Sequence, residues 1–195
     1  FWICKAIEID TRLRIGSIVD KDEIQSNKRM LSKLKGWGHA EEPPAITTDG
    51  RGGCQDAMKE LWGEENEDKW QYIQFIRQKI PGEGIRTKTK IIYGNASTID
   101  YLGANLSYVD RTQLTSRQMN GRLVRKTLSF SKKGKFLEAS CILDDWIYNL
   151  VKTVRTLRLK ENEKWQYFSP AMKAHITDHL WTIEELLKTV VNPST

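Results

Sequence analysis

Cysteine is scarce in this 195-residue sequence, which contains Cys4, Cys54 and Cys141. The three are widely spaced and odd in number, and none belongs to a C-x-x-C pair. This pattern indicates neither a disulfide framework nor a zinc knuckle, and it favours a reducing, cytosolic setting.

Long apolar runs are also absent. No stretch approaches the length that a membrane-spanning helix needs, and no signal peptide, internal repeat or low-complexity segment is evident. Length and composition are those of a globular protein with one or at most two domains. Phe1 lies inside an apolar strand pattern and no initiator Met precedes it, so we expect the chain to be a fragment.

Several common catalytic patterns are missing. No Ser-His-Asp or Cys-His set can be recognised, and the glycines of residues 82–84 lack the lysine and the spacing of a phosphate-binding loop. His175 and His179 are four residues apart and share a potential helical face with Asp178. A metalloprotease helix needs Glu after the first His, where this chain has Ile176, so we expect a capping or packing role for this group.

Acidic residues are absent between Asp110 and Glu138, and this segment is strongly basic. Its cations are Arg111, Arg117, Arg122, Arg125, Lys126, Lys132, Lys133 and Lys135. The positive charge of this segment therefore exceeds the formal net charge of the whole chain, which is +6. Lys and Arg confer non-specific affinity for nucleic acids by neutralising phosphates. A solvated basic surface explains most such runs, so composition alone leaves both interpretations open.

Apolar, β-prone segments separated by turn residues predict the strands. They span residues 1–9, 13–19, 45–48, 70–76 and 89–93. Asp10 and Thr11 lie between the first two segments and predict a tight hairpin.

Helical spacing of apolar residues predicts two helices in the first half of the chain. The first should be capped by Asp20 or Asp22, with Gly36 just past its end. The second carries Ala57, Met58, Leu61 and Trp62 on one face.

From Ser107 onward the pattern is helical, and Ser107-x-x-Asp110 resembles a capping box that places Asp110 in the first turn. Arg122, Arg125 and Lys126 stand three and four residues apart, so we expect them on one helical face. Ser131 should open a second long helix, and Thr182-x-x-Glu185 should cap a last one. The inward residues expected for the second helix are Phe136, Leu137, Cys141, Ile142, Trp146 and Leu150.

The basic segment resembles the signature of insertion-element transposases of the insertion-sequence-one family, roughly S-Y-V-E-R-x-N-L-T-x-R-x-x-x-x-R-L-x-R-K-T-x-S-F-S-K. The matching residues are Ser107, Tyr108, Val109, Arg111, Leu114, Thr115, Arg117, Arg122, Leu123, Arg125, Lys126, Thr127, Ser129, Phe130, Ser131 and Lys132. Residues 46–50 resemble the T-D-G block of the family, and residues 169–172 and 177–181 resemble its tail. The resemblance therefore covers nearly the whole chain.

Strands followed by helices predict an α+β fold. The resemblance implies a three-layer, ribonuclease-H-like arrangement, in which a mixed sheet carries helices on both faces. We expect residues 1–168 to form this catalytic core and residues 169–195 a helical tail.

Asp49 and Asp110 match the second and third acids of the DDE catalytic triad of the family. The resemblance implies that both carboxylates converge to hold Mg²⁺, or Mn²⁺ in its place, for phosphodiester hydrolysis and strand transfer. An Asp-Gly pair after a strand and an Asp in a first helical turn also occur simply as a turn and a cap partner. With the motif matched around both residues, catalysis is the favoured interpretation.

Two departures from the family pattern concern the third acid and its surroundings. Asp110 stands where the family has Glu. The Asp side chain is one methylene shorter, so its carboxylate lies about 1.5 Å, one C–C bond length, closer to the backbone. A misplacement of about 1 Å can cost a hundredfold in rate, so weakened or lost activity is expected. Gln113 replaces an Asn of the family.

The first acid of the triad is expected upstream of Phe1, on a strand that the chain lacks. Asp10 is read as a turn residue, and Glu8 is a weaker candidate still. Without that strand we expect a gap or a non-native pairing between the strand at residues 1–9 and the strand ending at Asp49. The fragment by itself should then be catalytically inert.

The implied protein is a DNA transposase of the prokaryotic cytoplasm, associated with the nucleoid and with no membrane. Its partners would be the double-stranded DNA of transposon ends and target, and further copies of itself. Arg111, Arg117, Arg122, Arg125, Lys126, Lys132 and Lys133 would bind the DNA backbone. A decayed transposase that binds DNA without cutting it, and a ribonuclease-H-like nuclease, remain as alternatives.

Overall fold

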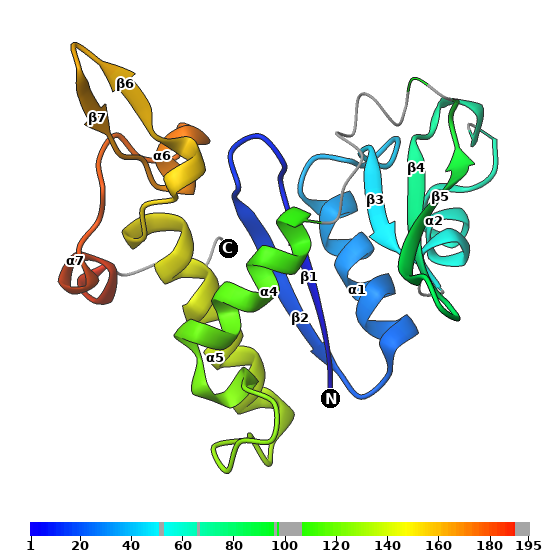
Figure 1. The fold of residues 1–195 in the computed structure, drawn as a ribbon, viewed down its shortest axis with the longest axis horizontal. Helices are drawn as coiled ribbons and strands as arrows, with labels where there is room; N and C mark the ends of the chain where they lie inside the picture. Colours follow the sequence, from blue (N-terminus) through cyan, green and yellow to red (C-terminus); the bar gives the residue numbers. More distant parts are fainter. Residues whose placement is uncertain (51–52, 66, 96, 98–106, 190–195) are drawn as a thin grey trace. The chain divides into compact units, whose positions relative to one another are not determined.

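The chain folds as an α+β protein with several small sheets. The computed structural model describes residues 1–195 apart from 51–52, 66, 96, 98–106 and 190–195 (Figure 1). In the described residues the strands form three sheets, with the orders β1-β2, β3-β4-β5 and β6-β7. A single mixed sheet containing all the predicted strands is therefore not observed in this part of the chain.

The chain divides into two compact units. The first contains Phe1–Cys4 and Ile18–Asp110, and the second contains Lys5–Ser17 and Arg111–Thr195. The boundary predicted at residue 168 is not tested by this division and stays a prediction.

The predicted N-terminal hairpin is confirmed. It consists of β1 (Trp2–Ile7) and β2 (Arg14–Asp20), joined by a turn that contains Asp10. Glu8 holds the turn, because its carboxylate accepts hydrogen bonds from the backbone N–H groups of Asp10 and Thr11. These bonds favour the ionised carboxylate, which lowers the pKa of Glu8 although its burial opposes the shift. Glu8 and Asp10 are therefore both structural residues of the turn.

Two helices of the first unit begin and end close to the predicted residues. α1 (Glu23–Gly36) is capped by Asp22, whose side chain accepts from the N–H of Gln25. α2 (Cys54–Trp62) buries Ala57 and Met58, as its periodicity predicts. The two helices share one apolar core with the strand residues Tyr72 and Tyr93.

The sheet of the first unit is mixed. β3 (Ile46–Asp49) pairs in parallel with β4 (Tyr72–Ile80), which pairs antiparallel with β5 (Gly84–Tyr93). Parallel pairing follows from the crossover through α2, which returns the chain to the same edge. β4 and β5 are longer than predicted, because a tight turn at residues 81–83 lets the two strands continue pairing past their apolar segments.

The two long helices of the second half of the chain differ from the prediction. α4 (Ser107–Met119) has Asp110 in its first turn, as predicted, and ends before Asn120. α5 (Gly134–Trp146) begins three residues later than expected and continues as a π-helical turn, Ile147–Val151. Of its predicted inward residues, Leu137, Cys141 and Leu150 are buried, whereas Phe136, Ile142 and Trp146 are exposed. Asp144 and Asp145 occupy buried positions instead.

The C-terminal part contains a hairpin that the sequence pattern does not reveal, β6 (Leu159–Glu161) and β7 (Lys164–Gln166). Two short helices follow, α6 (Pro170–Lys173) and α7 (Ile183–Lys188). The predicted capping box of α7 is present, with Thr182 and Glu185 each bonding the other's backbone. Across the residues described, no helix has the length and apolar character needed to cross a membrane.

Candidate functional site

Asp49 is the last residue of β3, and its side chain is exposed. In the sheet it is paired with Phe75 of β4. Because residues paired side by side in a sheet point to the same face, Asp49 shares a face with Phe75. Ile46 and Tyr72 belong to the opposite face, which packs against α1 and α2. Asp49 is therefore on the face that these two helices leave free.

Gly50, directly after Asp49, crosses close over β4. A Cβ atom at this position would lie 2.8 Å from Cγ1 and 3.3 Å from Cα of Ile76. We expect Gly50→Ala to destabilise the first unit by about 1–3 kcal/mol through this overpacking. Urea unfolding followed by circular dichroism measures the change. Gly36→Ala is the control, since an added Cβ there meets nothing within 4 Å. Equal losses in both variants would show that Ile76 does not confine Gly50.

Asp110 lies in the first turn of α4 and forms an ion pair with Arg77 of β4. Both side chains are 51% exposed. An ion pair this exposed contributes about 0–1 kcal/mol, so another cation or an anion can displace either partner. The ion pair with Arg77 therefore fixes the position of Asp110 only weakly.

The two predicted acids both have a partner on β4. Asp49 is paired with Phe75, and Arg77, the partner of Asp110, lies two residues further along β4. Alternate residues of a strand share a face and are about 7 Å apart. The β4 residues that these two acids contact therefore lie at alternate positions of one strand. That the two carboxylates come close enough to share a metal stays a prediction.

The donor chemistry of this pair suits a hard divalent cation. Mg²⁺ prefers carboxylate oxygens and keeps several water ligands, so two acids can supply part of its coordination shell. The Arg77 guanidinium competes for the same Asp110 oxygens. In the part of the chain that the structure describes, no three His, Cys, Asp or Glu side chains gather as a metal-binding group, at this place or at another.

The predicted basic residues are exposed except for Arg117, which is half-buried, and part of the segment is not helical as predicted. Arg122, Arg125 and Lys126 do not share a helical face, because α4 ends at Met119 and a short 3₁₀ turn, Gly121–Leu123, follows. Asn120 caps this turn by accepting from the N–H of Arg122. The remaining predicted cations lie on α4 (Arg111, Arg117) or precede α5 (Lys132, Lys133). That they border Asp49 and Asp110 stays a prediction.

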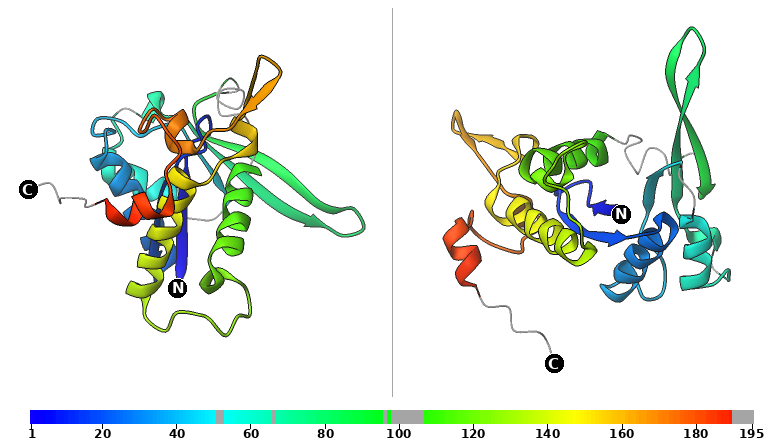
Figure 2. Two further views of the ribbon diagram at one scale, coloured as in Figure 1. Left: turned by 90° about the vertical axis from the view of Figure 1, so that its left-hand side faces the viewer. Right: turned by 90° about the horizontal axis from the view of Figure 1, so that it is seen from below.

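A second basic surface was not predicted and lies on the β4–β5 hairpin. Its cations are exposed and divide between the two faces of the hairpin, with Arg77 and Lys79 on one face and Arg86, Lys88 and Lys90 on the other. The hairpin extends past α1 and α2 of its own unit (Figure 2), so both of its faces are accessible at the far end. The alternation of Thr and Lys in residues 87–90 was the available signal, since it is typical of a strand with one charged face.

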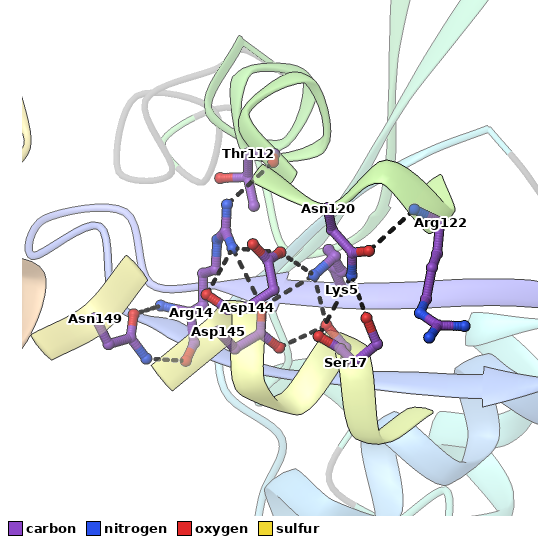
Figure 3. A network of polar contacts seen from close by, with 10 residues as sticks. Lys5, Arg14, Ser17, Thr112, Asn120, Arg122, Asp144, Asp145 and Asn149 are labelled. Atoms are coloured by element: carbon purple, nitrogen blue, oxygen red, sulfur yellow. Dashed lines mark hydrogen bonds and ion pairs between the residues drawn. The ribbon is translucent and has the colours of Figure 1, made fainter. Parts of the chain in front are cut away.

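A buried ionic cluster in the second unit was also missed (Figure 3). Lys5 lies 2.9 Å from Asp145, and Arg14 lies 2.9 Å from Asp144 and 3.4 Å from Asp145. Ser17 donates a further hydrogen bond to Asp145. All four ionic side chains are buried. Charged residues at positions inside apolar strand and helix patterns were the sequence signal.

Further contacts complete the surroundings of Arg14. Its guanidinium donates to the carbonyl of Thr112 in α4 and lies 3.8 Å from the ring centroid of Tyr148. Asn149 brackets the Arg14 backbone by donating to its carbonyl and accepting from its N–H. The cluster therefore joins the hairpin, α4 and α5, and its two acids and two bases balance in charge.

The histidine group serves the C-terminal segment. His179 contacts Asp178 through Nδ1 and Glu185 through Nε2, and its ring stacks on Trp181. The two carboxylates raise the pKa of His179, with Asp178 the larger cause. His175 is not part of this contact set; its backbone has a positive φ of 56°. His179 thus contacts a residue of the α7 capping box, which Thr182 and Glu185 form themselves.

The cysteines offer no reactive thiol. All three are free, and burial raises the pKa of Cys4 to about 12 and those of Cys54 and Cys141 to about 11. The charge of Asp49 contributes to the shifts of Cys4 and Cys54. At neutral pH the thiols are protonated and therefore poor nucleophiles.

Comparisons of the chain with protein-family models, with curated proteins and with solved structures found no match in any of the three.

Proposed function

We propose that the chain is the catalytic core of a DNA transposase that cleaves and joins phosphodiester bonds with a divalent metal ion. The observation that supports the proposal is that Asp49 is paired with Phe75 of β4 and that Asp110 forms an ion pair with Arg77, two residues further along the same strand. These are the two acids that the transposase resemblance assigns to the triad. They come from segments far apart in the sequence, as a site built by tertiary folding requires.

The order of elements supports the same proposal. A β hairpin, a helix, a strand ending in an acid, a second helix and a parallel strand follow one another along the chain. This order matches the elements that follow the first strand in a ribonuclease-H-like fold. β1 pairs with β2 and β3 pairs with β4, in separate sheets, where the proposed arrangement has an additional strand between β1 and β3.

In the proposed chemistry, a bound Mg²⁺ or Mn²⁺ would polarise the phosphate and activate the attacking oxygen. Asp49 and Asp110 would hold the ion. Arg77 keeps Asp110 oriented toward β4 before the ion binds and becomes free to contact a phosphate afterwards. The exposed cations of the basic segment and of the β4–β5 hairpin would bind the DNA backbone.

The second candidate is a transposase derivative that binds DNA without cutting it. The ion pair of Arg77 with Asp110 favours it, because a guanidinium on the shorter acid opposes metal binding at that position. The candidates differ in one measurable property, the affinity of the acid pair for a divalent ion.

Titration of the chain with Mn²⁺, followed by electron paramagnetic resonance, tests the proposal. We expect Asp49→Asn and Asp110→Asn each to weaken binding by about tenfold or more, since each removes a ligand oxygen. Arg77→Gln should strengthen binding, because the competing cation is lost. Asp56→Asn, at an exposed position in the first turn of α2, is the control.

Binding unchanged in both Asn variants would refute the metal site and leave the DNA-binding candidate. Strand transfer by the complete gene product then separates the candidates directly. Asp49→Asn should abolish it in a transposase, and Asp110→Glu should raise it by up to about a hundredfold by extending the carboxylate to the family length.

A further inference from the structure

The loop between α4 and α5 exposes large apolar side chains at its tip. In the loop Val124–Lys133, Leu128 is 98% exposed and Phe130 is 59% exposed. The loop lies beyond the ends of the two helices that it joins (Figure 1). A leucine in full contact with water loses the free energy that burial would provide, roughly 1.5–3 kcal/mol. Such exposure on a short loop indicates a surface that another molecule covers.

Cations flank this apolar tip on both sides. Arg125 and Lys126 precede Leu128, and Lys132 and Lys133 follow Phe130; all four are exposed. Among the residues that the structure describes, none of the four has a carboxylate partner. The partner of the loop must therefore offer closely spaced anions with an apolar surface between them.

Hydrogen bonds within the loop hold its backbone in a defined conformation. Thr127 Oγ1 accepts from the N–H of Ser129 at 3.1 Å, and Arg122 donates to Ser131 at 3.0 Å. Ser129 lines a cavity at the base of the loop together with Arg122 and Asn120. Its neighbours Leu128 and Phe130 point outward, as their exposure shows. The two apolar side chains are thus presented in advance of binding.

We propose that this loop is a DNA wedge, in which Leu128 and Phe130 insert between stacked bases while the flanking cations hold the phosphates on either side. The inference depends on the proposed DNA-binding function and adds a distortion of the bound DNA to it. Apolar side chains such as Phe and Leu unstack base steps and kink the duplex in this way. Two neighbouring apolar side chains are enough to unstack one base step. Binding to a lipid surface increases with the buried apolar area and needs a larger apolar surface than these two residues provide.

Duplexes that contain 2-aminopurine at several positions test the wedge, because the fluorescence of this base rises when it is unstacked. The native chain should bind the duplex and raise the fluorescence at one or a few positions. The double variant Leu128→Ser, Phe130→Ser should bind about tenfold more weakly, with an unchanged salt dependence, and should lose the fluorescence rise. Arg125→Gln with Lys126→Gln should instead reduce the salt dependence.

Leu187→Ser is the matched control, because Leu187 is 72% exposed on α7, away from the basic segment. It should change neither affinity nor fluorescence. Binding without any fluorescence change by the native chain would overturn the wedge and leave the proposed function intact. Absence of DNA binding would overturn both. Binding of Leu128 and Phe130 to anionic lipid vesicles, without DNA unstacking, would assign the loop to a membrane surface and also overturn the wedge.

Discussion

Replacing Asp145 with Ala should lower the free energy of unfolding of the second unit by more than any substitution at its surface. Lys5 and Arg14 would then remain buried with Asp144 as their one carboxylate partner, and Ser17 would lose its acceptor. Removing one partner of a buried ion pair costs about 3–5 kcal/mol, because the remaining charge is left uncompensated away from water. Native domains are stable by about 5–15 kcal/mol, so this loss would be a large fraction of the total. Urea denaturation of the purified chain measures it.

Asp10→Ala is the matched control, since this carboxylate is exposed in the turn of the hairpin. It should change the free energy of unfolding by less than about 0.5 kcal/mol. Replacing Lys5 with Met and Asp145 with Leu together should recover much of the loss, because an apolar pair of similar volume often substitutes for a buried ion pair. A loss below about 1 kcal/mol for Asp145→Ala would contradict the burial of the cluster.

Charge reversal of Arg122 and Arg125 should give the largest effect on DNA binding. If each contacts one phosphate, removing two contacts lowers the slope of log affinity against log salt by about 1.8. In 0.1 M salt this corresponds to roughly a 60-fold loss of affinity before any added repulsion. Fluorescence anisotropy with a labelled duplex at several salt concentrations measures both quantities.

The control for this effect lies in the same unit. Lys160→Glu with Lys164→Glu reverses two exposed charges on the β6–β7 hairpin and changes the net charge equally. An equal loss in both double variants would indicate general attraction of DNA to a basic protein and no localised surface. The same assay with Lys88→Glu and Lys90→Glu determines whether the β4–β5 hairpin takes part.

Much of the candidate site was predictable because the signals are local. Asp49 ends a strand before a glycine, and Asp110 falls in a first helical turn; both assignments depend on turn and helix chemistry within a few residues. The end of α4 was local as well and was missed. Asn120-Gly121 is a strong turn signal, which the continuing positive charge obscured.

The contacts of these residues could not be predicted in the same way. Nothing near Asp110 in the sequence identifies Arg77 as its partner, because the two residues are 33 positions apart in the chain. Lys5, Arg14, Asp144 and Asp145 were likewise unremarkable until the hairpin and α5 were seen to enclose them.

The sequence by itself determined the hairpin turn at Asp10 and Thr11, the start of α1 at Asp20 or Asp22, the cap at Thr182, the end of β3 at Asp49 and the basic character of the α4–α5 connection. These features depend on neighbouring residues and on charge, which a linear chain already contains. Only the tertiary structure decided how the strands divide among sheets, which face of α5 is buried, and that the partners of Asp49 and Asp110 lie on one strand, β4. Those outcomes depend on packing between distant segments, and a periodic pattern leaves open what each face will meet.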